Sequence, residues 1–387
     1  MIILIYIALT IVLGALLLTF TFRLERSIRQ FQINKRYPVI NDAPSVSVCV
    51  PARNETHAMT QCLERVLASD YPKMEVVVFD DESSDDTSIL INSFAHAGVR
   101  FIPGNPLPTG WLGRNYALET LAREASGTYI IFLGVDTHIK PDTISQLVSY
   151  MMTENLEMTS VIPSRNDTWR SNVLFGYLRY FWQLLLSRPS APAAASSLWM
   201  IRRRTLLSTI GGFVSHKAEV EPEARLASLI GIKAYRCLVD NQQLGISYEK
   251  KWQSQRETSR RLLYPMVGGA WVAALGSLIV LMLLNVPSIV LISGLFVEWS
   301  RLHSLSLLYL LLFAALYGRY TYVIWGRNWW LGPLVWPVVI FQELCVFVES
   351  VYGYARGTVT WKGRPVKSPK MAQQASLHSN ANDQTTI

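Results

Sequence analysis

Long apolar runs at both ends of the chain constrain its fold more than any other feature. Residues 1–22 carry no charged side chain, and runs of similar length occupy 263–284, 305–325 and 331–352. A helix of about 20 apolar residues is long enough to cross the hydrocarbon core of a bilayer. The shorter run 286–299 is one further candidate. The sequence therefore predicts one N-terminal and three to four C-terminal transmembrane helices.

Basic residues indicate which side of the membrane the polar segments occupy. The formal net charge is +8, and basic residues gather beside the apolar runs, at 23–36, 256–261 and 362–370. This placement is typical of the cytoplasmic face of a membrane, and we do not expect nucleic acid as a partner. Because 23–36 and 362–370 favour the same side, we expect an even number of C-terminal crossings, with 286–299 counted as a span. The sequence thus predicts a multi-pass protein of the cell (plasma) membrane.

Composition divides the chain into six segments. No basic segment precedes the first apolar run and no small-residue cleavage site ends it, so we expect an uncleaved anchor. The four cysteines lack metal-ligand spacing and are expected to be free thiols. The predicted segments are an N-terminal transmembrane anchor (1–22), a basic juxtamembrane linker (23–44), a folded domain (45–261), the C-terminal transmembrane helices (262–352), a cytoplasmic basic segment (353–367) and a disordered tail (368–387).

Strand-like and helix-like pieces alternate through the folded domain. This alternation is typical of an α/β fold in which helices cover a mostly parallel sheet. The predicted strands are 45–50, 74–79, 99–102 and 129–133. The last of them, YIIFL, contains no strongly polar residue, and we therefore expect it to be buried on both faces.

Aspartates follow two of these strands. Asp80 and Asp81 end the second strand, and Asp136 lies just past the fourth. Ligands of parallel sheets bind at the carboxyl edge, and neighbouring carboxylates repel unless a cation or hydrogen-bond donors share the space. We therefore expect a metal or a sugar nucleotide at this edge. Alternatively, Asp136 caps a helix that begins near residue 141, as Asp85 and Asp86 are placed to cap the helix that follows them.

The segment GWLGRN, residues 110–115, lies between the third and fourth strands. Two glycines around Trp111 favour a loop whose backbone approaches a ligand, with Arg114 as a cation at a helix start. A turn that packs Trp111 into the core is the alternative.

The run VLFGYLRYFWQLLL, residues 173–186, is too short to span a bilayer. We expect an interfacial helix, with a buried core helix as the alternative. Arg319, Glu343 and Glu349 lie inside longer apolar runs. Charges in such runs are functional candidates, although they also snorkel or pair with one another.

Four motifs carry a resemblance to a known family. PARNE from Pro51, VVVFDDESSDDT from Val76, GWLGRNYAL from Gly110 and GTYIIFLGVDTHIKP from Gly127 occur in one order. Together they resemble the nucleotide-binding half of family-2 glycosyltransferases, which have the Rossmann-like GT-A fold. The similarity is strongest to the membrane-anchored branch that glycosylates lipids, such as carotenoid, hopanoid-associated and ceramide-type enzymes. MIRRRTLLSTIGGF (200–213) and TWKGRP (360–365) are also similar to that branch.

The resemblance implies a donor site at the motif positions. Asp81, with Asp80 beside it, corresponds to the aspartate that reads the nucleotide base. Arg114, next to Gly113, stands where the family usually has lysine and keeps a cation near the diphosphate. The turn residues that would line the nucleotide pocket are Pro51, Ala52, Arg53 and Glu55.

The resemblance also implies a divalent metal, Mg²⁺ or Mn²⁺. Asp136 matches the last aspartate of the family's D-x-D metal motif, whose first position is Gly134 in this sequence. The implied metal ligand is therefore Asp136 alone.

The acceptor half departs further from the family. Aligning Leu226 and Ala227 with the family's Leu-Ala places Glu223 at the general-base position and Pro222 where an acidic neighbour is usual, with Glu221 as the other candidate base. The alternative is a solvated acidic first turn that favours the helix dipole. The family's Q-x-x-R-W motif has no match within 249–261, where Gln253, Gln255 and Arg256 are the nearest substitutes.

The implied function is inverting transfer of a sugar from a nucleotide-diphosphate donor, a UDP-sugar, to a lipid acceptor. The catalytic domain would lie at the cytoplasmic membrane face. Two other functions fit the departures from the motifs: a catalytically inactive nucleotide-sugar-binding membrane subunit and a processive polysaccharide synthase.

Overall fold

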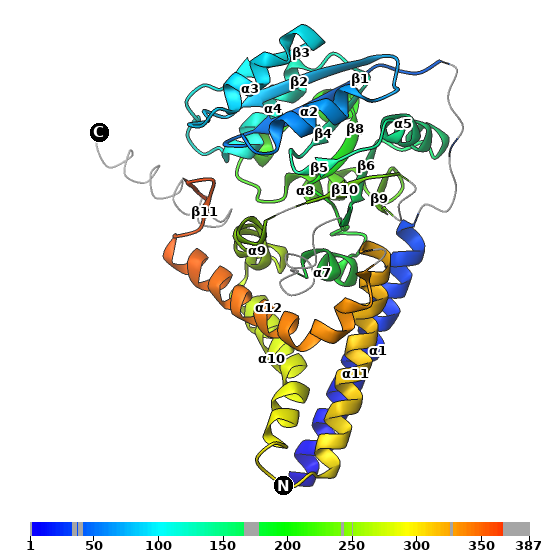
Figure 1. Ribbon diagram of the computed structural model, residues 1–387, viewed down its shortest axis with the longest axis vertical. Coiled ribbons are helices and arrows are strands. Elements are labelled where there is room, and N and C mark those ends of the chain that lie inside the picture. The colour runs from blue at the N-terminus through cyan, green and yellow to red at the C-terminus, as the bar shows by residue number, and fades with distance from the viewer. Residues whose placement is uncertain are drawn as a thin grey trace, which may run out of the picture. The chain divides into compact units, whose positions relative to one another are not determined.

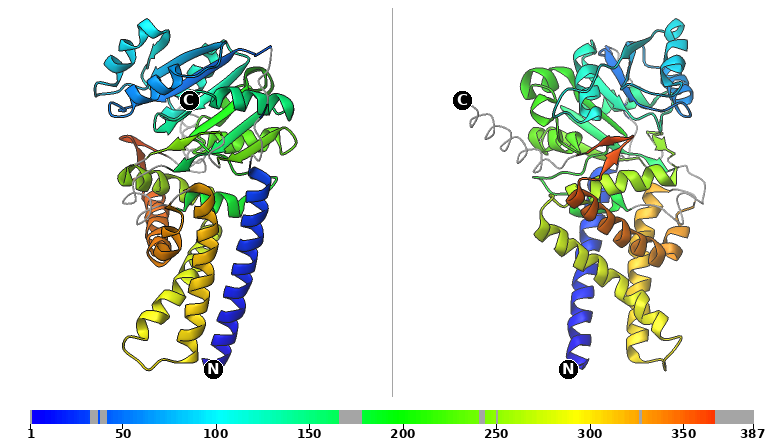
Figure 2. Two further views of the ribbon diagram at one scale, coloured as in Figure 1. Left: turned by 45° about the vertical axis from the view of Figure 1, so that its right-hand side comes forward. Right: turned by 90° about the vertical axis from the view of Figure 1, so that its left-hand side faces the viewer.

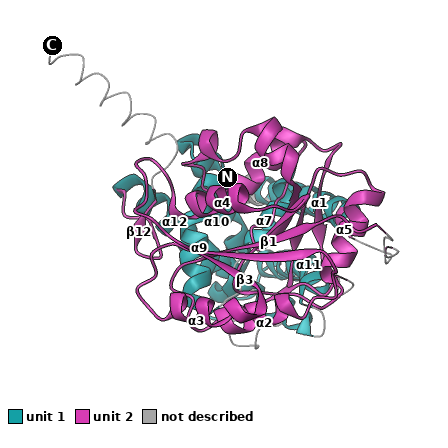
Figure 3. Ribbon diagram, turned by 90° about the horizontal axis from the view of Figure 1, so that it is seen from above, with its two compact units in different colours: residues 1–30, 165–187, 250–356 teal, residues 31–164, 188–249, 357–387 magenta. Residues whose placement is uncertain are grey.

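The computed structural model describes residues 2–32, 37, 42–165, 178–240, 244–249, 251–325 and 328–366. The predicted disordered tail and parts of the juxtamembrane linker lie outside these ranges. Two compact units make up the chain, as Figure 3 shows by colour. Unit 1 consists of Met1–Gln30, Arg165–Ser187 and Lys250–Arg356, and unit 2 consists of Phe31–Ser164, Arg188–Glu249 and Gly357–Ile387.

Unit 2 is built on a seven-stranded sheet with the strand order β3-β2-β1-β4-β8-β6-β9 (Figure 1). β8 runs antiparallel to its neighbours β4 and β6, and the other pairs are parallel. The mostly parallel α/β sheet that the sequence predicts is therefore confirmed. The strands are β1 (Val46–Ala52), β2 (Met74–Asp80), β3 (Val99–Pro103), β4 (Tyr129–Leu133), β6 (Met158–Ile162), β8 (Leu198–Arg202) and β9 (Tyr235–Val239).

The β4 strand is buried on both faces, as its uninterrupted apolar sequence predicts. Ile131 belongs to a core cluster with Val48 and Val50 of β1 and with apolar residues of two flanking helices. Phe132 points to the other face, where it stacks on Trp199 at 4.3 Å. Burial of each such side chain contributes about 1.5–3 kcal/mol. The sheet is therefore held by apolar contacts on both sides, and its strand ends are free to carry polar residues.

Within the described residues, five α-helices of unit 2 accompany this sheet. α4 packs on β1 and β2, and its buried residues include Leu118 and Leu121. α2 and α5 contribute Leu63 and Leu147 to the core cluster on the opposite face. The helices are α2 (Met59–Leu67), α3 (Thr87–Ser93), α4 (Gly113–Glu124), α5 (Thr143–Thr153) and α8 (Pro222–Ile230).

Two smaller sheets also occur among the described residues. One has the strand order β5-β10-β7, and the other is the antiparallel hairpin β11-β12 near the end of the described chain. These strands are β5 (Thr137–His138), β7 (Ser164–Arg165), β10 (Ser247–Tyr248), β11 (Thr360–Trp361) and β12 (Arg364–Pro365). The hairpin is far from the sheet in sequence but belongs to the same unit.

Unit 1 is helical. α1 and α11 lie side by side (Figure 2), because the Tyr309 hydroxyl donates to the Thr10 carbonyl at 2.8 Å and Arg319 pairs with Glu25 at 2.7 Å. The charge inside this apolar run is thus paired within the unit. The helices are α1 (Ile2–Phe31), α7 (Arg179–Leu186), α9 (Trp252–Met266), α10 (Trp271–Ser293), α11 (Arg301–Ile324) and α12 (Leu331–Arg356).

Four helices within the described residues are long and apolar enough to cross a membrane: Ile7–Phe31, Trp271–Ser293, Arg301–Ile324 and Leu331–Arg356. The prediction of a separate span at 286–299 is wrong, because residues 286–293 continue α10. The predicted span from residue 263 also begins elsewhere. Gly268 and Gly269 adopt positive φ angles of 89° and 61°, which end one helix and allow α10 to start at Trp271.

Helix α7 covers the second half of the segment that we expected to lie at the interface. The first half falls largely in 166–177, outside the described residues. Phe181 is fully buried against Tyr317, Tyr320 and Trp336. The described part of the segment therefore matches the buried-helix alternative.

Candidate donor and acceptor site

Asp81 occupies a buried position at the carboxyl edge of the sheet. It directly follows β2, is 2% exposed, and its N–H donates to the Ala52 carbonyl at the end of β1 at 2.8 Å. Two arginines flank its carboxylate, Arg364 at 2.9 Å and Arg53 at 3.9 Å. Arg53 also donates to the Asp81 carbonyl. Within the described chain, neither carboxylate oxygen of Asp81 accepts a hydrogen bond of good geometry.

Gly113 lies directly against the Asp81 carboxylate. A Cβ at this position would lie 2.7 Å from Asp81 Oδ2, so the first turn of α4 approaches the carboxylate only because residue 113 has no side chain. The adjacent glycine and aspartate therefore form one structural feature, although they are 32 positions apart in sequence.

Burial raises the pKa of the Asp81 carboxyl, while the guanidinium groups of Arg364 and Arg53 lower it. The net direction is upward. A carboxylate in this position is thus sensitive to the loss of either arginine.

The other predicted pocket residues are engaged in contacts within the protein. Asp80 accepts hydrogen bonds from the hydroxyls of Ser83 and Ser88 and thereby closes the turn after β2. Ala52 is buried in the core cluster, and Pro51 precedes it in β1. The Glu55 carboxylate pairs with Lys362 at 2.8 Å. Among the predicted pocket residues, Asp81 therefore contacts Arg53 and Ala52 directly and lies beside Gly113.

Asp85 supports the start of α3, as the capping interpretation expects. Its carboxylate accepts the Thr87 N–H at 3.1 Å, while Asp86 occupies the N-cap position without a side-chain bond to the helix. Partial burial opposes ionisation, but hydrogen bonds from Thr56 and Thr87 lower the pKa of Asp85 to about 2. Asp85 therefore stabilises the turn that begins α3.

Arg114 and Glu223 form the second buried ion pair of this edge. Arg114 Nη1 lies 2.9 Å from Glu223 Oε2, and the glutamate is 1% exposed. Glu223 does lie in the first turn of α8, but because it is buried, the solvated-turn alternative is wrong for this residue. Its Oε1 has no hydrogen-bond partner among the described residues. Glu221, the other candidate base, occupies the N-cap position of α8 and is half-buried.

Asn115 joins the two halves of this site. Its side-chain amide donates to the carbonyls of His216, Lys217 and Glu219 at 2.8–3.1 Å. The segment before α8 is thereby tied to α4. Three consecutive residues of α4, at 113–115, thus contact Asp81, Glu223 and the segment that precedes α8.

Trp111 lies just before this helix and is half-buried. It packs edge-on against Tyr116 at 5.8 Å. This contact supports the packing alternative for the indole ring.

Asp136 lies between β4 and β5 and is half-buried. It does not cap α5, which begins at Thr143 with Asp142 at its N-cap. In the described parts of the chain, no three His, Cys, Asp or Glu side chains are grouped as a metal site. A single carboxylate does fit a divalent ion whose remaining ligands come from substrate phosphates and water.

The Gly134 position leaves room for a side chain. A Cβ there would meet nothing nearer than the Ser197 carbonyl and the Thr137 hydroxyl, both at 3.4 Å. Glycine is therefore not imposed at this position by crowding of its Cβ.

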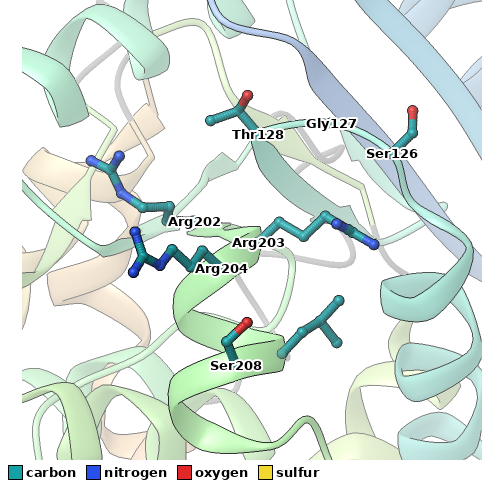
Figure 4. A pocket seen from close by; sticks show the side chains of 8 residues that line it. Ser126, Gly127, Thr128, Arg202, Arg203, Arg204 and Ser208 are labelled. Carbon is teal, nitrogen blue, oxygen red and sulfur yellow. The ribbon is translucent and has the colours of Figure 1, made fainter.

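A shallow pocket of about 520 Å³ lies at the opposite edge of the sheet (Figure 4). Residues 126–128, before β4, and residues 202–204, at the end of β8, line it together with Leu207 and Ser208. In Figure 4 the side chain of Arg203 points away from those of Arg202 and Arg204. This pocket contains none of the predicted site residues.

Residues 47–207 match the glycosyl transferase family 2. The chain carries a family-2 glycosyltransferase domain. An uncharacterised glycosyltransferase of Haemophilus influenzae is 30% identical over 120 residues, 30% of this chain and 46% of that protein. An Escherichia coli protein named UDP-Glc:alpha-D-GlcNAc-diphosphoundecaprenol beta-1,3-glucosyltransferase is 29% identical over 111 residues, 29% of this chain and 42% of that protein. The chain thus spans less than half the length of these relatives.

The fold of the chain is similar to a solved GT-A-like structure. The mannosyltransferase PcManGT from Pyrobaculum calidifontis, in complex with GDP-Man and Mn²⁺, superposes with a TM-score of 0.58 at 17% identity. The match covers 89% of this chain and 97% of that one. The GT-A fold predicted from the motifs is thereby confirmed.

Sequence reasoning missed three contacts of the glycosyltransferase site. It assigned no role to Asn115, Lys362 or Arg364, although TWKGRP was noted as a motif of the lipid-glycosylating branch. The two cations of that motif, Lys362 and Arg364, were the sequence feature that could have indicated a role in the site. Their partners lie about 280–310 positions earlier in the chain, so no local pattern connects them.

Proposed function

We propose that the protein transfers a sugar from a nucleotide-diphosphate donor to a lipid acceptor, with inversion, at the cytoplasmic face of the cell membrane. The observation that carries the proposal is the buried Asp81 carboxylate beside Gly113, whose oxygens accept no hydrogen bond of good geometry within the described chain, at the edge where α4 also holds Glu223. Its proposed ligand is a uracil base, whose imide N–H can donate a hydrogen bond to a carboxylate. A UDP-sugar is therefore the first donor to test.

Asp136 is the proposed protein ligand of a divalent metal. When bound, such an ion neutralises charge on the donor's diphosphate. A Mn²⁺ ion accompanies GDP-Man in the PcManGT complex, which supports the same role here.

Glu223 is the proposed general base. The acceptor oxygen attacks the anomeric carbon from the face opposite the diphosphate, its proton passes to a Glu223 oxygen, and the nucleoside diphosphate leaves with the bonding electron pair. Arg114 donates to Oε2, which leaves Oε1 to receive the proton. The proposed role of Arg114 is therefore to orient the base, whereas the resemblance implies a contact with the diphosphate.

The lipid acceptor and the membrane location rest on two observations. Four described helices have the length and composition of membrane spans. The E. coli relative is named for transfer to a diphosphoundecaprenol-linked sugar. We therefore propose a multi-pass membrane enzyme with its glycosyltransferase domain in the cytoplasm.

The test uses the full chain purified with its lipids. Labelled UDP- and GDP-sugars are added with Mn²⁺ or Mg²⁺, and the lipids are extracted. A singly glycosylated lipid supports the proposal. Failure to bind any nucleotide sugar overturns it, binding without transfer or donor hydrolysis indicates an inactive binding subunit, and a polymeric product indicates a polysaccharide synthase.

A further inference from the structure

The hairpin β11-β12 is docked on the donor edge of the glycosyltransferase domain. Its turn is formed by Lys362 and Gly363, both with positive φ, and the flanking Val359 and Val366 are 3% and 6% exposed. The Val366 N–H donates to the Val359 carbonyl at 2.8 Å. These contacts fix the hairpin, so the side chain of Arg364 projects from a defined backbone.

Ion pairs join the hairpin to the turns that follow β1 and β2. Arg364 reaches Asp81 at 2.9 Å and Glu82 at 2.6 Å. Lys362 reaches Glu55 at 2.8 Å, and its carbonyl accepts from Arg53 at 3.3 Å. These three acidic partners, Asp81, Glu82 and Glu55, belong to segments that the family motifs place in the nucleotide pocket.

Arg364 is the nearer of the two cations beside Asp81. Its distance of 2.9 Å compares with 3.9 Å for Arg53, and the Arg364 side chain is only 16% exposed. A buried carboxylate without a close cation takes up a proton more readily, and a protonated carboxyl no longer offers two charged oxygens to an imide N–H. The charge of Asp81 thus depends on a residue from the far end of the chain.

We propose that Arg364 is a positioning residue of the donor site, which keeps Asp81 ionised and oriented for the nucleotide base. The C-terminal hairpin accordingly contributes to nucleotide recognition, in addition to packing on the domain surface. This inference rests on the proposed function, because it takes a nucleoside diphosphate as the ligand of Asp81.

The experiment measures UDP binding to the full-length protein with Mn²⁺ as a function of pH, for the wild type and for Arg364→Gln. Binding requires ionised Asp81, so it is present above the pKa of that carboxyl and is lost as the pH falls through it. Loss of Arg364 raises this pKa. We therefore expect the acid limb, which is the fall in UDP binding at low pH, to move to a pH about one to three units higher. The donor KM should rise with little change in kcat.

Three further variants serve as controls. Arg364→Lys keeps a cation and should retain the limb near its wild-type position. Arg204→Gln removes an exposed arginine at the opposite edge of the sheet and should leave binding unchanged. In an Asp81→Asn background, Arg364→Gln should cause no further loss of UDP affinity, because the carboxylate that Arg364 positions is already gone. Titration of the UDP phosphate is common to all variants and cancels between them.

A measurement on the wild type covers the case in which Arg364→Gln fails to fold. UDP should slow amide hydrogen exchange in residues 360–365, and unchanged exchange overturns the inference. An Arg364→Gln protein with wild-type affinity and an unshifted acid limb overturns it as well. If the wild type binds no nucleoside diphosphate, including GDP and CDP, the proposed function itself fails.

Discussion

At the scale of single residues, the site consists of two buried carboxylates that are each paired with arginine. Asp81 meets Arg364 at 2.9 Å and Glu223 meets Arg114 at 2.9 Å. Breaking a buried pair leaves an uncompensated charge, which is far more costly than losing a surface ion pair. Substitutions at these positions should therefore affect donor binding or catalysis, whereas the surface of the protein should stay unchanged.

Glu223→Gln keeps the size of the side chain and a hydrogen-bond acceptor for Arg114, but it removes the proposed base. We expect kcat to fall by about 10²–10⁴-fold with little change in donor affinity. Steady-state kinetics and UDP titration on the same preparation separate the two effects. Glu221→Gln is the matched control, and a greater loss for Glu221→Gln than for Glu223→Gln would assign the base to residue 221 instead.

Asp136→Ala should abolish Mn²⁺-dependent transfer, because Asp136 is the proposed protein ligand of the metal. Gly134→Asp is the reciprocal change and restores the first carboxylate of the D-x-D pattern at a position with space for a Cβ. We expect it to tighten Mn²⁺ binding in the presence of UDP by roughly tenfold, since ligand charge tunes affinity. A sugar-transfer assay with Mn²⁺ tests Asp136→Ala, and calorimetry with Mn²⁺ tests Gly134→Asp. Full activity of Asp136→Ala would place the metal elsewhere.

At the scale of elements, the start of α4 organises the site. Gly113 approaches Asp81, Arg114 binds Glu223, and Asn115 donates to three carbonyls of the segment before α8. The helix thereby links the donor edge to the acceptor half through three consecutive residues, 113–115. A displacement of this turn should affect both halves together.

Gly113→Ala tests this arrangement. The new Cβ would lie 2.7 Å from Asp81 Oδ2, so the helix or the carboxylate must shift. Forced overpacking costs about 1–3 kcal/mol, and UDP affinity should fall by roughly ten- to a hundredfold. Gly276→Ala in α10 meets no atom within 4 Å and is the control. Equal UDP affinity of the two variants would show that the close approach is unnecessary.

At the scale of the whole molecule, unit 2 contains chain segments from both sides of the C-terminal helices. Residues before Glu249 and the hairpin after Gly357 meet directly through Asp81 and Arg364. Segments in contact lie on the same side of a membrane, so an even number of crossings separates them. We therefore predict that two of the three helices α10, α11 and α12 span the bilayer.

We predict that α12 is the helix that does not cross. Its Glu349 pairs with Arg256 and Arg260 of the polar helix α9, which is an unfavourable arrangement inside hydrocarbon. A reporter tag after Ile387 should therefore share the side of the glycosyltransferase domain, and a tag in the turn at 294–300 should lie on the opposite side. Protease protection in sealed vesicles distinguishes the two, and a C-terminal tag on the far side would contradict the prediction.

The sequence by itself determined the elements whose signal is local. YIIFL predicted a strand buried on both faces, and β4 has those bounds, because five consecutive apolar residues leave no face for water. Strand ends carrying Asp81 and Asp136 followed from the same reasoning, as did most of the membrane-like helices. Local signals were weaker at helix ends, so residues 286–293 were separated from the helix that contains them.

Only the tertiary structure decided which charges meet. Arg114 contacts Glu223 across 109 positions, and Arg364 contacts Asp81 across 283. Ion pairs of this kind depend on the folded backbone and on burial, and neither is encoded in the spacing of the residues. The residue types at the edge of the sheet could thus be predicted, whereas their partners, and the participation of the C-terminal hairpin, required the fold.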